Sequence, residues 1–324
     1  MTRRQHTGAL TLCACHIPDG LALACTPSLS EADGTLRGTM IAREIARSTG
    51  EEGVGLYVFC FARADAAGVA MGHGLDAAAP LGARMHEDLA AICCEVPLHE
   101  WTGEAGEAHL KDLGWLGPRA LRHEAVIEQM MRASPVLPLR FGCLFSSAER
   151  LDALLRRERA RISAFIEKAA HEEEWSLQGL LDVRACEEAM FAADPRVAKL
   201  PAQAGARYLM EQKLRKDAVR AAHAWAQETQ AELARALEGL VLDWRPLRPP
   251  SRNPEQPERE GVFHWALLLP RGAEAELARR LEPLAEPLSA RGLHLSARGP
   301  WPAYNFAPHL GDMPGDGSEV WAHD

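Results

Sequence analysis

Histidine, cysteine and glutamate side chains are the groups of this chain that could act as nucleophiles, acids, bases or metal ligands. His171-Glu172-Glu173-Glu174-Trp175 begins like a metalloprotease helix motif, but Trp175 occupies the position of the second histidine. Cys143 lies in an apolar, strand-like run, where cysteine is far more often inert core than a nucleophile. The sequence also has no Gly-rich phosphate loop and no Gly-x-Ser-x-Gly motif. We therefore expect a protein that is not an enzyme.

Metal and cofactor sites are not expected either. Cys13, Cys15, His16 and Cys25 form a loose cluster, but their spacing matches no common zinc pattern. The other cysteines are scattered, and several lie in apolar runs, as small buried hydrophobic residues do. This usage is typical of an intracellular chain with reduced thiols, so we expect a cytoplasmic protein.

The bulk composition is that of a soluble globular protein. The chain has 324 residues, of which 47% are hydrophobic and 25% charged, and its net charge is −9. An acidic balance argues against a nucleic-acid partner, because such proteins usually present a basic face. No apolar run approaches the ~20 residues that a membrane-spanning helix needs, so we expect no membrane partner.

The first half of the chain predicts an extension followed by a small α+β domain. Residues 1–52 carry weakly periodic sequence with turn signals, which favours a poorly ordered extension. Residues 53–146 follow as the N-terminal domain. Its expected strands cover 56–61, 89–96 and 136–145, and a helix that begins near Gly117-Pro118 is expected to cover one face of the sheet.

The second half predicts a connecting helix and a C-terminal domain. Ser146 and Glu149 form a capping box, and a stripe of apolar residues at helical spacing follows, so residues 147–172 are expected to be a helix. Residues 173–310 alternate strands and long helices in the order β-α-β-β-α-β, which predicts a ferredoxin-like domain. Its 245–260 loop is rich in proline, and residues 311–324 read as an acidic, disordered tail.

Three segments make this sequence resemble the gas vesicle protein GvpL/GvpF family over roughly residues 55–308. They are Val136-Leu137-Pro138-Leu139-Arg140-Phe141-Gly142, Glu174-Trp175-Ser176-Leu177 and Gly299-Pro300-Trp301-Pro302-Ala303-Tyr304-Asn305-Phe306. The segment Ala204-Gly205-Ala206-Arg207-Tyr208-Leu209 is similar to a further part of the family. Residues 1–52 match nothing in it.

The resemblance implies an accessory protein of gas vesicle formation without enzymatic activity. Its expected partners are the small hydrophobic shell protein, whose aggregation it would prevent during assembly, and other gas vesicle accessory proteins. A shell subunit that polymerises through apolar surfaces aggregates unless a partner covers them. Edge strands and an aromatic tail suit such a partner, by strand addition or groove packing. A place in the vesicle itself stays open.

The same segments contain the residues that we single out for partner binding or structure. They are Arg140, Phe141, Glu174, Trp175, Trp301, Tyr304 and Phe306. We expect Arg140 to form a buried or interdomain ion pair with Glu124, Glu173 or Glu174. Glu174-Trp175 is expected to fix the domain junction. Trp301, Tyr304 and Phe306 are expected to lock onto the C-terminal domain or, alternatively, to anchor a partner.

Two hypotheses from other classes remain at this point. One is an enzyme with an interdomain active site that uses His171, Glu174 or Cys143. The other is an RNA-binding ferredoxin-like module, which would need exposed aromatic side chains on the sheet. Phe263 and Trp265 are the candidates for that role, although their apolar neighbours argue against it.

Overall fold

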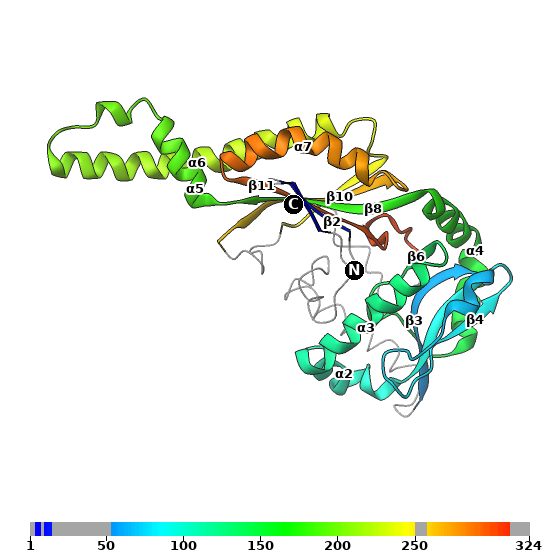
Figure 1. Ribbon diagram of the computed structural model, residues 1–324. Coiled ribbons are helices and arrows are strands. Elements are labelled where there is room, and N and C mark those ends of the chain that lie inside the picture. Colours follow the sequence, from blue (N-terminus) through cyan, green and yellow to red (C-terminus); the bar gives the residue numbers. More distant parts are fainter. Residues whose placement is uncertain (1–3, 8–9, 15–52, 250–257, 312–324) are drawn as a thin grey trace. The chain divides into compact units, whose positions relative to one another are not determined.

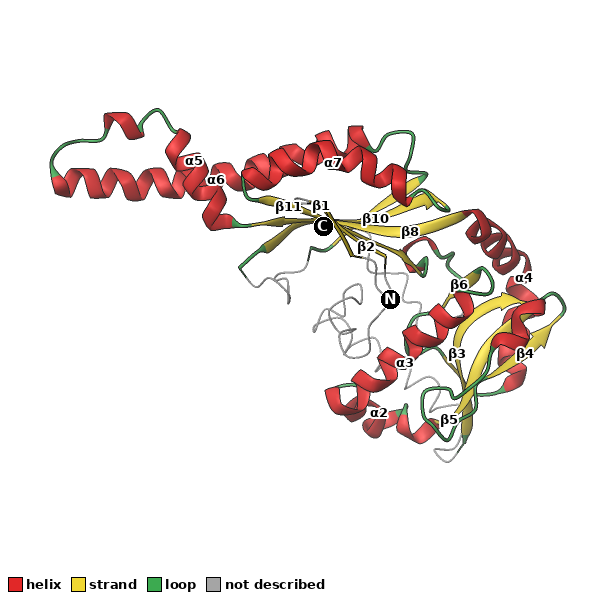
Figure 2. Cartoon of the chain, in the orientation of Figure 1, coloured by secondary structure: helices red, strands yellow, loops and turns green. Residues whose placement is uncertain are grey.

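The computed structural model divides the chain into two compact units, each of which contains one sheet (Figures 1 and 2). The structure describes residues 4–7, 10–14, 53–249 and 258–311. The five-stranded unit contains described residues 53–172 and 302–311, and the rest belong to the six-stranded unit. Both units combine helices with a sheet, which confirms the expected α+β class.

The five-stranded sheet is antiparallel in every pairing of its described strands. Its order is β4-β5-β3-β6, and β7 also pairs with β3. The strands are β3 (Val54–Arg63), β4 (Gly82–His86), β5 (Leu89–Pro97), β6 (Val136–Pro138) and β7 (Leu144–Phe145). The helices are η2 (Ala64–Val69), η3 (Leu98–Glu100), α2 (Gly103–His109), α3 (Leu113–Met131), α4 (Ala148–His171) and η5 (Tyr304–Phe306).

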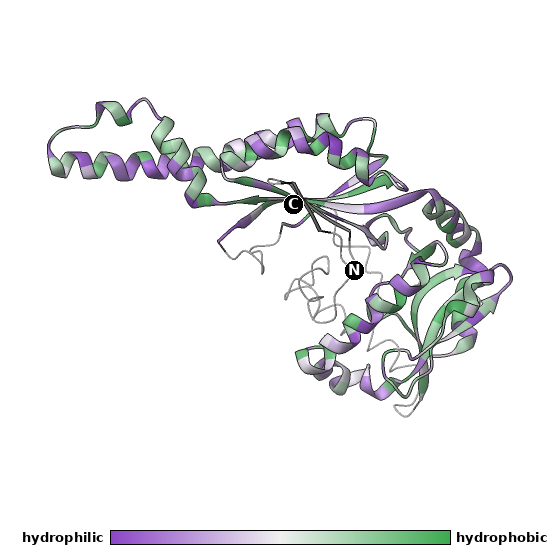
Figure 3. Ribbon diagram, viewed as in Figure 1, coloured by the Kyte–Doolittle hydropathy of each residue, from purple (hydrophilic) through white to green (hydrophobic). Residues whose placement is uncertain are grey.

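This sheet is covered on both faces, whereas we expected a helix on one face only. Tyr57 and Phe59 of β3 pack in a cluster with α3, and Val58 and Phe61 pack in a second cluster with α4. The pairing of β3 with β5 shifts register between Val58 and Cys60, and such a bulge changes which side chains face each cluster. The two central strands β3 and β5 are accordingly mostly apolar (Figure 3). Helix α4 therefore packs on this sheet and is part of the unit.

The expected strand over 136–145 is interrupted by a turn. Strand β6 ends at Pro138, β7 begins at Leu144, and Gly142 between them has a φ of 89°. Proline has no N–H with which to continue a ladder, and glycine adopts positive φ without steric cost. Arg140 lies in the interruption, and this is why it faces solvent instead of the core.

The six-stranded sheet has the order β1-β2-β11-β8-β10-β9. Its strands are β1 (Arg4–Thr7), β2 (Leu10–Ala14), β8 (Glu172–Leu181), β9 (Asp243–Leu247), β10 (Glu260–Pro270) and β11 (Leu293–Trp301). Its helices are α5 (Val183–Ala193), η4 (Val197–Lys199), α6 (Ala204–Ala236) and α7 (Glu274–Ala290). Strand β2 runs parallel to β11, and β8 runs antiparallel to it.

Strands β1 and β2 correct the expectation that all of residues 1–52 form a poorly ordered extension. They pair with each other and extend the sheet beyond β11. Backbone pairing with the open edge of β11 supplies an order that the weak periodicity of this segment does not reveal. The remainder of 1–52 lies outside the described residues, as do 250–257 of the proline-rich loop and 312–324 of the expected tail.

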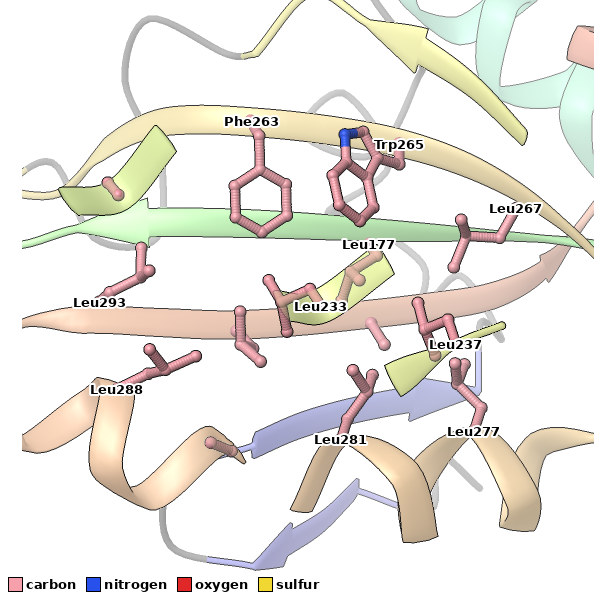
Figure 4. Close-up of a cluster of buried hydrophobic side chains, with 14 of the residues drawn as sticks. Leu177, Leu233, Leu237, Phe263, Trp265, Leu267, Leu277, Leu281, Leu288 and Leu293 are labelled. Atoms are coloured by element: carbon pink, nitrogen blue, oxygen red, sulfur yellow. The ribbon is translucent and has the colours of Figure 1, made fainter. Parts of the chain in front are cut away.

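Helices α6 and α7 bury one face of the six-stranded sheet. Figure 4 shows Leu177 of β8 with Phe263 and Trp265 of β10 in one cluster with leucines of the two helices. Phe263 and Trp265 are only 3% and 6% exposed, because these helices cover them. They are thus unavailable for stacking on nucleotide bases, which removes the observation that the RNA-binding hypothesis needs.

Trp175 belongs to the same core, where it packs directly on the backbone of β11. A Cβ atom added to Gly299 would lie 2.6 Å from Cδ2 of the indole and 3.0 Å from the carbonyl oxygen of Glu174. The indole Nε1 donates a hydrogen bond of 3.0 Å to Oε1 of Glu173, which also accepts one of 3.2 Å from the backbone N–H of Gly272. Glu173, and not Glu174, therefore orients this tryptophan.

We predict that Gly299→Ala destabilises the protein, because either the indole or strand β11 must move to admit the methyl group. The expected loss in the free energy of unfolding is about 1–3 kcal/mol. Urea denaturation followed by circular dichroism measures it. Gly205→Ala is the matched control, since a Cβ there meets nothing within 4 Å. Equal stability of the Gly299→Ala variant and the native chain would contradict this packing.

Candidate functional site

The best-defined group of polar side chains lies under a strap that we define as residues Pro302–Gly311. The strap follows strand β11 and belongs to the five-stranded unit. Tyr304 packs in the α3 cluster, and Leu310, which is 2% exposed, packs in the α4 cluster. A segment without strands and with one short 3-10 helix is thus held by side chains that reach into both cores.

Two further side chains and a backbone carbonyl satisfy the hydrogen bonds of the Tyr304 hydroxyl and the imidazole of His123, which also contact each other. Tyr57 Oη lies 2.8 Å from His123 Nδ1, and His123 Nε2 lies 3.0 Å from the carbonyl oxygen of Leu139. The Tyr304 hydroxyl donates to Oε1 of Glu124 over 3.0 Å and lies 3.3 Å from His123 Nε2. We call Tyr57, His123, Glu124 and Tyr304 the strap lock.

The surroundings of His123 determine its tautomer. The carbonyl of Leu139 can only accept a hydrogen bond, so Nε2 carries the proton. The backbone N–H of Gly142 donates to Tyr57 Oη over 3.1 Å, which leaves the Tyr57 hydroxyl hydrogen free to donate to Nδ1. Burial lowers the pKa of His123 to about 3, so the ring is neutral near neutral pH.

Glu124 is the titrating group of the strap lock. Burial raises its pKa to about 7, and the nearby carboxylate of Glu128 acts in the same direction. The hydrogen bond from Tyr304 opposes this shift, because it favours the charged carboxylate. Burial also raises the pKa values of Tyr57 and Tyr304 well above the ordinary value, so both hydroxyls keep their protons.

Aromatic rings surround the lock on the β3 side. Phe141 lies between three other rings, at centroid distances of 5.6 Å from His123, 5.7 Å from Trp101 and 5.8 Å from Tyr57. Its angles to His123 and Tyr57 are those of edge-to-face pairs, which are worth about 0.5–1.5 kcal/mol beyond buried area. Phe141 therefore packs within the aromatic cluster of the five-stranded unit.

The far end of the strap is held by arginines of α4. Arg157 Nη2 donates to the carbonyl oxygen of Gly311, and Arg161 Nη1 donates to that of His309 over 3.3 Å. Both guanidinium groups also lie against the buried Glu158 carboxylate, at 3.0 and 3.4 Å. Part of the arginine-rich face of α4 thus binds the strap backbone.

The expected lock onto the C-terminal domain is placed differently in the structure. Trp301 ends strand β11 in the six-stranded unit, where it pairs with Glu174, whereas Tyr304 contacts the five-stranded unit. Phe306 is partly buried in η5. The two prolines flanking Trp301 interrupt the ladder, so the chain leaves the sheet before Tyr304.

Arg140 and Glu174 do not form the ion pair that we expected. Arg140 is exposed and has no ion pair with any residue that the structure describes. Glu174 is 3% exposed and lies in β8 of the other unit, next to Trp175 in the core. Glu124 bonds to Tyr304 instead. The sequence pointed to Glu124 but to the wrong partner.

The residues of the enzyme hypothesis are not brought together within either unit. Cys143 is buried, and burial raises its pKa to about 12, so its thiol is protonated near neutral pH. His171 is exposed at the end of α4, 3.9 Å from Glu167, and Glu174 belongs to the six-stranded sheet. Among described residues, no three metal-ligating side chains gather, and no helix is long and apolar enough to cross a membrane.

We predict that Tyr304→Phe destabilises the protein by about 1–2 kcal/mol, since Glu124 then loses its hydrogen-bond donor. Urea denaturation near neutral pH tests this. Tyr208→Phe is the matched control, because Tyr208 is exposed and bonds to no described residue. It is expected to stay within about 0.5 kcal/mol of the native chain. A Tyr304→Phe variant as stable as the control would show that the lock contributes nothing.

We also predict a pH-dependent gain from Glu124→Gln. A carboxyl group whose folded pKa of about 7 exceeds its ordinary value of 4.5 binds extra protons in the folded state, so its contribution to stability is lost as pH rises through this window. Gln keeps an acceptor for Tyr304 but does not titrate. The thermal midpoint of the variant relative to the native chain should therefore be higher at about pH 8 than at about pH 5. A constant difference would contradict the raised pKa.

Comparisons with known proteins identify the family to which this chain belongs. The model of the gas vesicle synthesis protein GvpL/GvpF family matches residues 55–308. Gas vesicle protein L of Streptomyces sp. (strain CB03234) is 24% identical over 240 residues, which cover 72% of this chain and 85% of that protein.

Solved structures show the same fold. The crystal structure of the gas vesicle protein GvpF from Anabaena sp. PCC7120 superimposes with a TM-score of 0.57 at 18% identity, over 79% of this chain and 98% of that one. GvpF from Microcystis aeruginosa gives a TM-score of 0.51 at 17% identity, over 79% and 99% of the two chains. The family model spans most of the described residues of both units. This chain belongs to the GvpL/GvpF family of gas vesicle synthesis proteins.

Proposed function

We propose that this chain is a non-enzymatic accessory protein of gas vesicle formation that binds the small hydrophobic shell protein and prevents its aggregation during assembly. Membership of the GvpL/GvpF family supports the gas vesicle role. On this proposal the protein acts in the cytoplasm and at the vesicle, alongside other gas vesicle proteins. A shell subunit with apolar polymerisation surfaces needs such cover before it is incorporated.

The observation that carries the binding proposal is the edge strand β9. It is the last strand in the sheet order, and it pairs only with β10 among the described strands. Leu242 and Trp244 beside and within it are 53% and 51% exposed, although both side chains are large and apolar. An unpaired strand edge with exposed apolar side chains can accept an extended segment of another chain.

Two features of β9 limit what it can accept. Pro246 has no N–H and cannot donate a backbone hydrogen bond to an added strand. The edge can therefore form only a short ladder of hydrogen bonds, which disfavours pairing with long strands. The Trp244 ring lies 5.4 Å from that of Trp265 in the core, edge to face, so the exposed indole is held in place from beneath. A short apolar segment that lies on Trp244 is the partner that this edge fits.

We further propose that Glu173–Trp301 form a ferredoxin-like domain. The order β11-β8-β10-β9, with α6 and α7 on one face, supports this arrangement. Strands β1 and β2 then extend a four-stranded core of this type along the β11 edge, which leaves β9 as the edge with described, exposed side chains.

Co-expression with the small gas vesicle shell protein tests the proposal. The native chain is expected to keep the shell protein soluble and to retain it in a pull-down. Leu242→Ser combined with Trp244→Ser should lose most of the retained shell protein, because aromatic anchors dominate such interfaces. Met71→Ser, which changes a residue of the other unit that is 69% exposed, is the control and should behave as the native chain.

Two outcomes would count against this account. A folded native chain that retains no shell protein and leaves it aggregated would contradict direct binding. Full retention by the Leu242→Ser, Trp244→Ser variant would leave binding in place but would contradict the assignment to β9.

A further inference from the structure

The first part of α6 is a helix without a packing partner among the described residues. Figure 1 shows α5 and α6 as a helical hairpin that extends beyond the sheet of the six-stranded unit. None of the side chains of 204–213 is buried. At the rise of an α-helix, this exposed segment is about 15 Å long. Packing resumes at Leu214, which is 4% exposed, and at Arg215, which pairs with Glu187 of α5.

This bare stretch exposes three large apolar side chains in a row. Tyr208, Leu209 and Met210 are 61%, 70% and 44% exposed. Consecutive residues of an α-helix point about 100° apart, so the three surround much of the helix instead of forming one stripe for a core. We call these three residues, with Lys213 and Lys216, the hairpin head. An apolar surface of this kind on a soluble chain indicates an interaction site.

The hairpin head is basic within an acidic protein. Residues 183–220 contain eight Arg and Lys against five Asp and Glu, whereas the whole chain has a net charge of −9. Lys213 and Lys216 are exposed, lie three residues apart on one helix face, and have no ion pair with a described residue. The excess of negative charge in the rest of the chain is complementary to them.

The five-stranded unit presents a surface that matches the hairpin head. Leu113, the first residue of α3, is 73% exposed, which is more than any other large apolar side chain that the structure describes. Glu104 and Glu107 of the neighbouring α2 lie three residues apart and have no ion pair with a described residue. Residues 99–113 hold four acidic residues against one lysine. We call Leu113, Glu104 and Glu107 the acidic corner.

We propose that the hairpin head of one copy of this protein docks on the acidic corner of a second copy. Each surface has exposed apolar side chains beside a pair of charges with i, i+3 spacing, and the charges are opposite in sign. Burying Tyr208, Leu209 and Leu113 against one another supplies the apolar contact, and the lysine–glutamate pairs set the register. The contact joins different surfaces, so a pair of copies still has one free corner, on the copy whose head is bound, and one free head, on the other copy.

Such a head-to-corner contact produces assemblies that grow with concentration. A heterologous interface closes into a ring only where its rotation permits and otherwise extends. Because lysine–glutamate pairs at an interface rim are screened by salt, association should weaken as ionic strength rises. The inference concerns self-association and does not rest on binding of the shell protein.

Light scattering coupled to size exclusion tests the contact with the full chain at about 5 to 500 µM, where self-association depends on protomer concentration. The native chain should increase in mass with concentration. Tyr208→Ser with Leu209→Ser removes the head, and Leu113→Ser removes the corner. Each variant alone should stay monomeric, with a dissociation constant raised about tenfold or more. Both change exposed side chains, so circular dichroism should be unchanged.

A mixture of the two variants gives the decisive result. Each supplies the surface that the other lacks, so equal amounts should form a complex of twice the monomer mass and nothing larger. Lys213→Glu with Lys216→Glu should also abolish association, and mixing it with Glu104→Lys plus Glu107→Lys should restore it. Met71→Ser is the control and should associate as the native chain does.

Three results would overturn the proposal. The native chain could stay monomeric throughout the concentration range. The head variant could associate as strongly as the native chain, which would place self-association on another surface. The two variants could also fail to form a dimer when mixed, although the native chain associates.

Discussion

The buried imidazole of His123 places the strongest constraint on the five-stranded unit. Burial keeps the ring neutral, and a neutral ring needs one donor and one acceptor in fixed positions. Tyr57 of β3 supplies the first, and the Leu139 carbonyl, in the turn after β6, supplies the second. Tyr304 then joins the same group from the strap. Strand, helix, turn and strap are thus positioned by one set of polar atoms that cannot be left unpaired at low cost.

The sequence predicted the parts of this structure that follow from local patterns. The strand at 56–61, the helix after Ser146 and the strand-helix order from Glu174 onward all follow from apolar periodicity and end signals, although the N-cap of that helix is Ser147 and not the expected Ser146. The same patterns did not show that α4 would cover the second face of its sheet. A bulge near Phe59 changes which residues face each core, and no local pattern marks it.

Contacts between distant segments account for the rest of the differences. Strand β2 is ordered by pairing with β11, which lies at the other end of the chain. Tyr304 bonds to Glu124 across most of the sequence, so the lock could not be derived from spacing. Arg140 stood out because it is charged within an apolar run, but Gly142 turns the chain there, and the charge faces solvent. The sequence patterns therefore identified residues with a structural role more reliably than they identified the residues that these contact.

The physical account of function rests on the edge of the six-stranded sheet. Family membership gives the gas vesicle role, and on the proposed function the exposed Trp244 on β9 is where an apolar segment of a shell subunit binds. The contact with the Trp265 ring fixes the orientation of the Trp244 indole. Pro246, which has no N–H, limits the number of backbone hydrogen bonds that an added strand can form with this edge.

Hydrogen exchange of the soluble complex with the shell protein is the most direct measurement of this claim. The Trp244 amide donates to the exposed side chain of Asp243, so it should exchange readily at this edge and become protected when a partner strand bonds to it. The account predicts that protection on binding is centred on β9. Protection confined to other segments, with unchanged exchange along β9, would contradict it.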